Sequence, residues 1–206
     1  MEVSLYVEVP FCAFRPYASR EYQDTYPVPP PSAVYGMLLS MVGVQREEKS
    51  VHCGVEMALA VERLPKRAKV FRKLRRGKTL EDLRPDYQDL LLDLRLWIWL
   101  KEARDRAKVS LPTKIVQALA SPISVRRSGG LSLGESSYLV DTISIKEPPE
   151  IEGIFLQPND EGFFSLPVWV DHQDASRTRL RRFALVTQTL RGGLAGFWTD
   201  IPSFTS

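Results

Sequence analysis

The residues best suited to bind another molecule form a basic run in the first half of the chain. Between Arg63 and Lys78 there are nine basic residues and no acidic one. Four further arginines lie close together near the C-terminus: Arg177, Arg179, Arg181 and Arg182. A run of charges can be an ordinary solvated face. This one is dense enough to create a local positive field although the formal net charge is only +3. It therefore favours acidic partners, and nucleic acid above all.

Basic and aromatic side chains share faces of two predicted strands. The faces are Lys69, Phe71, Lys73 and Arg75 on one strand, and Arg95, Trp97, Trp99 and Lys101 on the other. Cations bind phosphates and flat rings stack on unpaired bases, so these faces suit single-stranded nucleic acid. The alternative for Trp97 and Trp99 is that they pack beneath the C-terminal part of the chain. The stretch from Lys69 to Lys78 is the stronger candidate for RNA contact, because charged side chains are seldom buried.

A glycine-rich segment, GGLSLGES, spans Gly129 to Ser136. Its glycines leave backbone N–H groups open to a phosphate, and its serines add hydroxyl donors. The segment lacks the GK[ST] ending of a P-loop and the glycine spacing of a dinucleotide-binding fingerprint. A glycine-rich turn before a strand would have the same sequence pattern.

Residues for catalysis are few. The only histidines are His52 and His172. His52 is adjacent to Cys53, and adjacent side chains rarely face each other as a Cys–His nucleophile pair requires. His172 has no surrounding residues at metal-ligand spacing, so we expect neither a metal nor a cofactor. A metal-free ribonuclease could still use Tyr17 or Tyr22 with His52 and a lysine.

Hydrophobic periodicity predicts the elements that position these residues. Alternation predicts strands over residues 2–9, 55–61, 66–75, 94–101, 151–156, 163–170 and 179–186. Ser32 is a candidate N-cap for a helix over 33–42 that stops at Gly43, and Pro112 can begin a second helix. Gly77 and Pro85 are expected to mark turns. In the fourth strand, Leu94, Leu96, Ile98 and Leu100 are expected to face inward.

This order of elements predicts an α+β fold: a ferredoxin-like split βαβ domain with an inserted β-hairpin. We expect this domain over residues 1–148, with an insertion at about 72–90, and a small β-rich extension over 149–206 packed on it. Among the 206 residues, the apolar run Leu90 to Leu100 is interrupted by charges and too short to span a membrane. The first residues show no signal peptide, and Cys12 and Cys53 are too few for a disulfide scaffold. We therefore expect a reduced, cytoplasmic protein.

Three segments in this order resemble the Cas five (Cas5) family of CRISPR-associated RAMP proteins. The most specific is YPVPPPSAVYGMLLSMVG, which leads into the first helix, and the others are the entry loop FRPYASREYQDT and GGLSLGES. The C-terminal FFSLPVWVDHQDASRTRLRRFAL resembles the DevS-type branch of that family. The resemblance covers nearly the whole chain.

The resemblance implies a non-catalytic subunit of a type I effector complex, Cascade. In that family a ferredoxin-like RAMP domain holds the 5′ handle of the CRISPR RNA and caps the filament of backbone RAMP subunits. The large PAM-reading subunit docks beside it, and the complex targets DNA. One branch instead cleaves the repeat with a tyrosine, lysine and histidine set. The absence of histidine from the expected thumb and entry loop argues against that branch, so a separate repeat-processing nuclease is expected.

The resemblance also implies roles for individual residues. The handle-binding entry loop matches the RNA-contact candidates Arg15, Tyr17, Arg20 and Tyr22. The family's thumb, an inserted hairpin that presses between nucleotides, matches the phosphate-facing candidates Arg72, Lys73, Arg75, Arg76 and Lys78. The glycine-rich loop supplies Gly129, Gly130, Ser132, Gly134 and Ser136. A guide RNA is held by its backbone and shape while base pairing reads the sequence, which fits these residue types.

Overall fold

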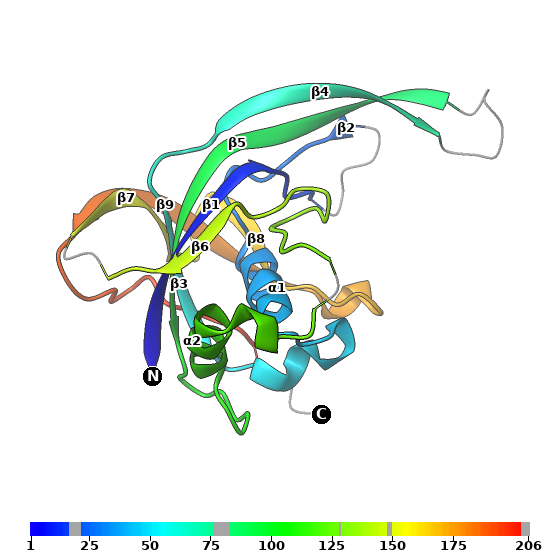
Figure 1. Ribbon diagram of the computed structural model, residues 1–206. Coiled ribbons are helices and arrows are strands. Elements are labelled where there is room, and N and C mark those ends of the chain that lie inside the picture. Colours follow the sequence, from blue (N-terminus) through cyan, green and yellow to red (C-terminus); the bar gives the residue numbers. More distant parts are fainter. Residues whose placement is uncertain (17–21, 76–82, 128, 148–149, 203–206) are drawn as a thin grey trace.

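The fold was determined from a computed structural model, which describes residues 1–16, 22–75, 83–127, 129–147 and 150–202 (Figure 1). The strands are β1 (Glu2–Cys12), β2 (Tyr22–Gln23), β3 (Glu56–Val61), β4 (Lys66–Arg75), β5 (Leu83–Lys101), β6 (Thr142–Ile145), β7 (Ile151–Pro158), β8 (Phe164–Trp169), β9 (Arg179–Leu190) and β10 (Thr199–Asp200). The helices are α1 (Pro31–Met41) and α2 (Leu111–Ala120), with 3₁₀ turns η1 (Arg46–His52), η3 (Pro122–Ser124) and η4 (Ala175–Arg177).

One large sheet carries the structure, in the order β6-β1-β5-β3-β7-β9-β8. All neighbours in this order pair antiparallel, as the alternating sequence patterns allow. The C-terminal strands join it because β7 pairs with β3. Helices α1 and α2 lie together on one side of the sheet (Figure 1). The predicted mixed α and β character is therefore correct.

The two faces of the sheet are both covered. On the helix side, Leu94, Leu96, Ile98 and Leu100 of β5 are fully buried, which confirms their predicted direction. On the other side, Trp97 and Trp99 pack with Tyr6, Phe155 and Phe197. The rings of Trp99 and Phe155 stack with centroids 5.9 Å apart. Only 7% of Trp97 and 8% of Trp99 is exposed, so the packing alternative is correct and these rings are not a nucleic-acid surface.

Strand β5 is much longer than predicted and pairs in two places, in the main sheet and in an extension formed with β4. Its C-terminal half lies in the main sheet, between β1 and β3, whereas its N-terminal half pairs with β4. The change occurs near Asp93, which has a positive φ of 55°. The β4–β5 pair forms an arm that extends from the body of the molecule (Figure 1).

The turn predicted at Pro85 is wrong. Pro85 lies within β5, opposite Lys73 of β4. A strand with a partner on only one side tolerates a proline, which lacks an N–H. At Pro85, β5 has that freedom, because the pairing with β2 covers only Tyr87 and Gln88. Gly77 lies outside the described residues.

Prolines also fix the helix starts. Helix α1 begins at Pro31 with Pro30 as its N-cap, so the prediction of Ser32 as N-cap is wrong. Proline suits the first helical position because its φ is preset and its missing N–H is not needed there. The predicted stop at Gly43 is confirmed by its φ of 79°, and α2 has Pro112 in its first turn as expected.

Candidate nucleic-acid interface

The arm presents an exposed row of aromatic rings. Phe71 of β4 lies opposite Tyr87 of β5, and Tyr87 lies opposite Tyr22 of β2. The rings of Phe71 and Tyr87 meet edge to face, 5.4 Å between centroids. Phe71, Tyr87 and Tyr22 are 52%, 48% and 42% exposed, which is unusual for side chains of this size. We call these three residues, together with Lys69, the aromatic platform.

Lys69 adds positive charge to this platform. Its Nζ lies 5.0 Å from the centre of the Tyr22 ring, a cation–π distance. A hydrogen bond with Tyr22 and the field of nearby acidic groups raise the pKa of Lys69, so it stays charged at neutral pH. The combination of rings and a cation can stack unpaired bases and neutralise a phosphate. Lys69 and Phe71 were predicted to share a strand face and Tyr22 was an RNA-contact candidate, whereas Tyr87 was not predicted. The segment 86–92, DYQDLLL, has no two-residue alternation of apolar and polar residues that would have predicted this part of the strand.

The platform is fixed to the body by buried polar groups. The Tyr22 hydroxyl donates to Oδ1 of Asp89 at 2.6 Å, and Asp89 is only 3% exposed. Arg67 supplies the counter-charge, with Nε 3.4 Å from Asp89 and Nη2 2.8 Å from Asp24. Arg67 also donates to the carbonyl of Thr25. This member of the basic run therefore holds the fold.

A second polar set joins the arm to the glycine-rich loop. Arg15 donates to Gln23 at 2.6 Å and to Glu135 at 3.1 Å. Gln88 of β5 donates to the same Glu135 oxygen at 2.9 Å, and Gln23 donates to Asp86 at 2.7 Å. Gln88 and Asp86 are almost fully buried. The entry loop, the arm and the glycine-rich loop thus meet at one place, with Arg15 at the centre and 44% of its side chain exposed.

Within the glycine-rich loop, Gly134 has a structural reason to be glycine. Its φ is 89°, and an added Cβ would lie 2.3 Å from the carbonyl oxygen of Ala13. Ser132 and Gly134 line a pocket. Gly129, Gly130 and Ser136 are exposed outside it.

The pocket has a volume of about 630 Å³ and opens beside this loop. One wall is the exposed face of α1, which carries the small residues Ser32, Ala33, Gly36 and Ser40. Basic groups surround it: Arg15, Arg46, Lys49 and Arg127, together with His172. The carboxylate in the lining, Glu135, is paired with Arg15. The pocket therefore combines close backbone access with a positive field, which suits an anionic ligand.

Lys49 holds one side of the pocket. Its ammonium lies 4.5 Å from the centre of the Trp169 ring and donates to the carbonyl of Val170. Desolvation lowers the pKa of Lys49. Desolvation also lowers the pKa of His172, and the positive charges of Lys49 and Arg46 lower it further. Arg46, Lys49, Arg127 and His172 were not predicted as site residues. They come from separate segments with no common spacing, so only the fold shows that they converge.

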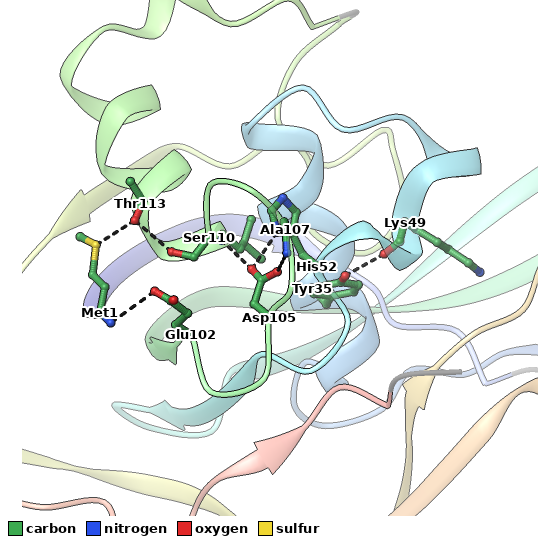
Figure 2. Close-up of polar contacts among 10 residues, drawn as sticks. Met1, Tyr35, Lys49, His52, Glu102, Asp105, Ala107, Ser110 and Thr113 are labelled. Carbon is green, nitrogen blue, oxygen red and sulfur yellow. Dashed lines mark hydrogen bonds and ion pairs between the residues drawn. The ribbon is translucent and has the colours of Figure 1, made fainter. Parts of the chain in front are cut away.

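His52 is placed for a structural role (Figure 2). Its side chain is 0% exposed, and Nδ1 lies 2.8 Å from Oδ2 of Asp105. Asp105 also accepts from the backbone N–H of Ala107 and of Leu111, at 2.9 and 2.8 Å, so it ties η1 to the start of α2. Burial raises the pKa of the neighbouring Cys53 thiol to about 11, which disfavours the thiolate. Because its side chain is fully buried, His52 is not accessible to a substrate. It is therefore not available for the ribonuclease chemistry considered from the sequence.

Some of the RNA-contact candidates predicted from the sequence are not brought to the pocket or the platform by the described structure. Tyr17, Arg20, Arg76 and Lys78 lie outside the described residues. Arg72, Lys73 and Arg75 lie on the outer part of β4. In the described ranges, no three His, Cys, Asp or Glu side chains gather as metal ligands, and no helix is both long and apolar enough to span a bilayer.

Comparison with solved structures gives the class of fold. The chain matches a chain of a solved "CRISPR RNA-guided surveillance complex" with a TM-score of 0.67 and 14% identity, over 96% of both chains. A second match, a solved "Cas protein", has a TM-score of 0.52 and 16% identity, over 91% of this chain and 94% of that one. The fold is therefore one found among CRISPR-associated proteins.

Sequence comparison then identifies the family. The family described as CRISPR-associated protein (Cas_Cas5) matches residues 3–115. The CRISPR-associated protein Cas5 of Myxococcus xanthus (strain DK1622) is 36% identical over 189 residues, covering 86% of this chain and 86% of the relative. The chain belongs to the Cas5 family, which confirms the resemblance noted in its sequence.

Proposed function

We propose that this protein is a non-catalytic, RNA-binding subunit of a type I CRISPR effector complex, Cascade. It anchors the 5′ handle of the CRISPR RNA and caps the filament of backbone RAMP subunits in the cytoplasm. The large PAM-reading subunit lies beside it, the assembly targets DNA, and a separate nuclease processes the repeat. The observation that carries the proposal is the junction of Arg15, Gln88 and Glu135, which joins the basic pocket and the glycine-rich loop to the arm that bears the aromatic platform.

The topology supports a ferredoxin-like RAMP domain with a thumb. In chain order, β1, α1, β3, β5, α2 and β6 form a β-α-β-β-α-β unit, and its strands lie in the order β6-β1-β5-β3. The β4–β5 arm is an extension inserted between β3 and the body of β5. We equate this arm with the thumb, and its platform with the surface that separates nucleotides.

The pocket and the platform hold different parts of the RNA. The small residues of α1 let a sugar-phosphate backbone approach closely, and the surrounding cations neutralise its charge. The rings of Phe71 and Tyr87 stack on bases regardless of sequence. Arg15 positions the entry loop and the glycine-rich loop against the arm through Gln23 and Glu135.

Two variants test the proposal with a synthetic RNA of the repeat-derived handle. Gly36→Leu fills the pocket from an exposed helical position where an added Cβ meets nothing within 4 Å, so we expect the variant to fold, which thermal unfolding checks. It should weaken RNA binding at least tenfold, or about 1.4 kcal/mol. The double variant Phe71→Ala, Tyr87→Ala should weaken it roughly 5- to 150-fold for one lost base stack of about 1–3 kcal/mol. Ile123→Ala, at a fully exposed residue outside the pocket lining, is the control.

Two results would overturn the proposal. Unchanged handle affinity in both variants would remove the pocket and the platform from RNA binding. Discrete cleavage of repeat RNA by the purified protein in EDTA would show that it is an endoribonuclease, which is the alternative function.

A further inference from the structure

The arginines of this protein fall into two groups. Those of one group are ion-paired at the surface, as shown by Arg63 with Asp93, Arg104 with Asp200 and Arg191 with Glu150; such exposed pairs contribute little to stability. A second group has no carboxylate within 4 Å among the residues that the structure describes. It includes Arg46 and Arg127 at the pocket, and three arginines near the start of β9: Arg179, Arg181 and Arg182.

These three β9 arginines, which we call the β9 row, are exposed on a paired strand. Arg182 donates to the carbonyl of Asp160 at 3.1 Å, and Arg179 donates to the carbonyl of Ser176 at 3.3 Å. A neutral carbonyl orients a guanidinium without cancelling its charge. The row therefore keeps its positive charge for a ligand, because rigid, unpaired arginines can bind phosphates through two donors at once.

The β9 row begins at the rim of the pocket. Arg179 lies opposite Trp169 of β8, whose ring makes the cation–π contact with Lys49, and Leu180 lies opposite Pro167. Pro167 lines the pocket. Arg179 and Arg181 alternate on the same face of β9, about 6.7 Å apart along the strand. Arg182 lies on the opposite face, because successive side chains of a strand alternate. Because β8 ends the strand order of the sheet, a strand of nucleic acid that leaves the pocket around β8 would meet Arg179 and Arg181 on one face and Arg182 on the other.

An exposed ring accompanies the row. Phe163 is 90% exposed, and its ring contacts Phe164 edge to face at 5.2 Å. The loop that carries Phe163 packs closely against β9: an added Cβ on Gly162 would lie 2.3 Å from the backbone of Phe183, and the Gly162 N–H donates to the carbonyl of Asn159 at 2.8 Å. The loop's own carboxylates, Asp160 and Glu161, form no ion pair with the row within the described ranges. Phe163 is two residues from Ser165, the pairing partner of Arg182. An exposed ring near a cation is the combination that binds unpaired bases.

We infer that the β9 row, together with Phe163, is a further contact site for single-stranded RNA, which begins at the pocket and passes around the β8 end of the sheet. The choice of RNA as ligand rests on the proposed function. The exposed ring favours a single strand over a duplex, whose bases are already stacked. The surface would extend the hold on the handle from the arm, past the glycine-rich loop, to the end of the sheet.

The test uses the full chain and synthetic handle RNAs shortened stepwise from either end. The triple variant Arg179→Gln, Arg181→Gln, Arg182→Gln should bind the complete handle at least tenfold more weakly. Its salt dependence, as the slope of log K against log[salt], should fall by about 2 for three lost phosphate contacts. Phe163→Ala should also bind more weakly, without loss of thermal stability. Both defects should vanish when the nucleotides that reach β9 are removed from one end.

A matched control separates local contact from total charge. Arg63→Gln, Arg104→Gln and Arg191→Gln together remove the same three charges at ion-paired positions. Equal weakening by this control, a defect that persists for every shortened RNA, or an effect confined to duplex DNA or to a protein partner would overturn the inference. Gly36→Leu weakens binding of complete and shortened RNA alike if the proposed function is correct, so the two failures are distinguishable.

Discussion

Replacing Gly134 by alanine tests whether the glycine-rich loop is pressed against the end of β1. The left-handed φ of 89° costs an alanine about 1–2 kcal/mol. The new methyl would also lie 2.3 Å from the Ala13 carbonyl oxygen. That carbonyl cannot yield easily, because the next residue, Phe14, is tied to Thr25 and Tyr26 by hydrogen bonds of 2.8 and 2.9 Å.

Gly129 provides the matched control within the same loop. Its φ of 76° carries the same conformational cost, but an added Cβ there meets nothing within 4 Å. Overpacking at Gly134 adds roughly 1–3 kcal/mol. The free energy of unfolding of Gly134→Ala should therefore be lower than that of Gly129→Ala by about this amount, which corresponds to a melting temperature roughly 2–12 °C lower.

The assay is urea and thermal unfolding of the two variants side by side, followed by handle binding. Gly134→Ala should also weaken RNA binding more than Gly129→Ala, because Glu135 follows it and joins the arm through Gln88. Equal destabilisation by the two alanines would refute the reasoning, since it would mean that the loop does not press on Ala13.

Three further predictions use other parts of the molecule. Phe155→Ala, in the covered outer face, should lower the free energy of unfolding by about 3–5 kcal/mol, and a loss below about 1 kcal/mol would contradict that packing. Gly36→Ala should raise stability by about 0.5–1 kcal/mol, because alanine favours a helix and the added methyl has space; a loss of stability would show that α1 is packed differently. Desolvation lowers the pKa of His52, and its buried Nε2 has no hydrogen-bond partner among the described residues. The unfolded chain therefore binds more protons, so stability should fall as pH drops below about 6.5. In a His172→Gln background, which removes the other histidine, His52→Asn should flatten this dependence; an unchanged slope would assign it to other groups.

The sequence correctly predicted burial where the apolar residues of a strand all lie on one face. The alternation of Leu94, Leu96, Ile98 and Leu100 correctly predicted which side of β5 meets the helices. It could not show that the opposite face, with Trp97 and Trp99, is also covered. The covering residues, such as Phe155 and Phe197, lie more than fifty positions later in the chain.

Local rules misled the prediction where tertiary pairing overrode them. Pro85 carries a turn signal, yet β4 holds it in a strand that continues to Lys101. Ser32 is a good N-cap by composition, but Pro31 already fits the first helical position. The role of Arg67 also depends on the fold, because its partners Asp24 and Asp89 reach it only through β2 and β5.

The sequence by itself determined the family, the strand faces and the concentration of positive charge, because these follow from residue types and short periods along the chain. Tertiary structure alone decided which charges are available to a ligand. Arg63 and Arg67 are neutralised by carboxylates from other segments, whereas Arg46, Lys49 and Arg127 converge on one pocket. A charge acts over a distance of about 10 Å or less in salt solution, so its effect depends on its neighbours in space rather than on its neighbours in the chain.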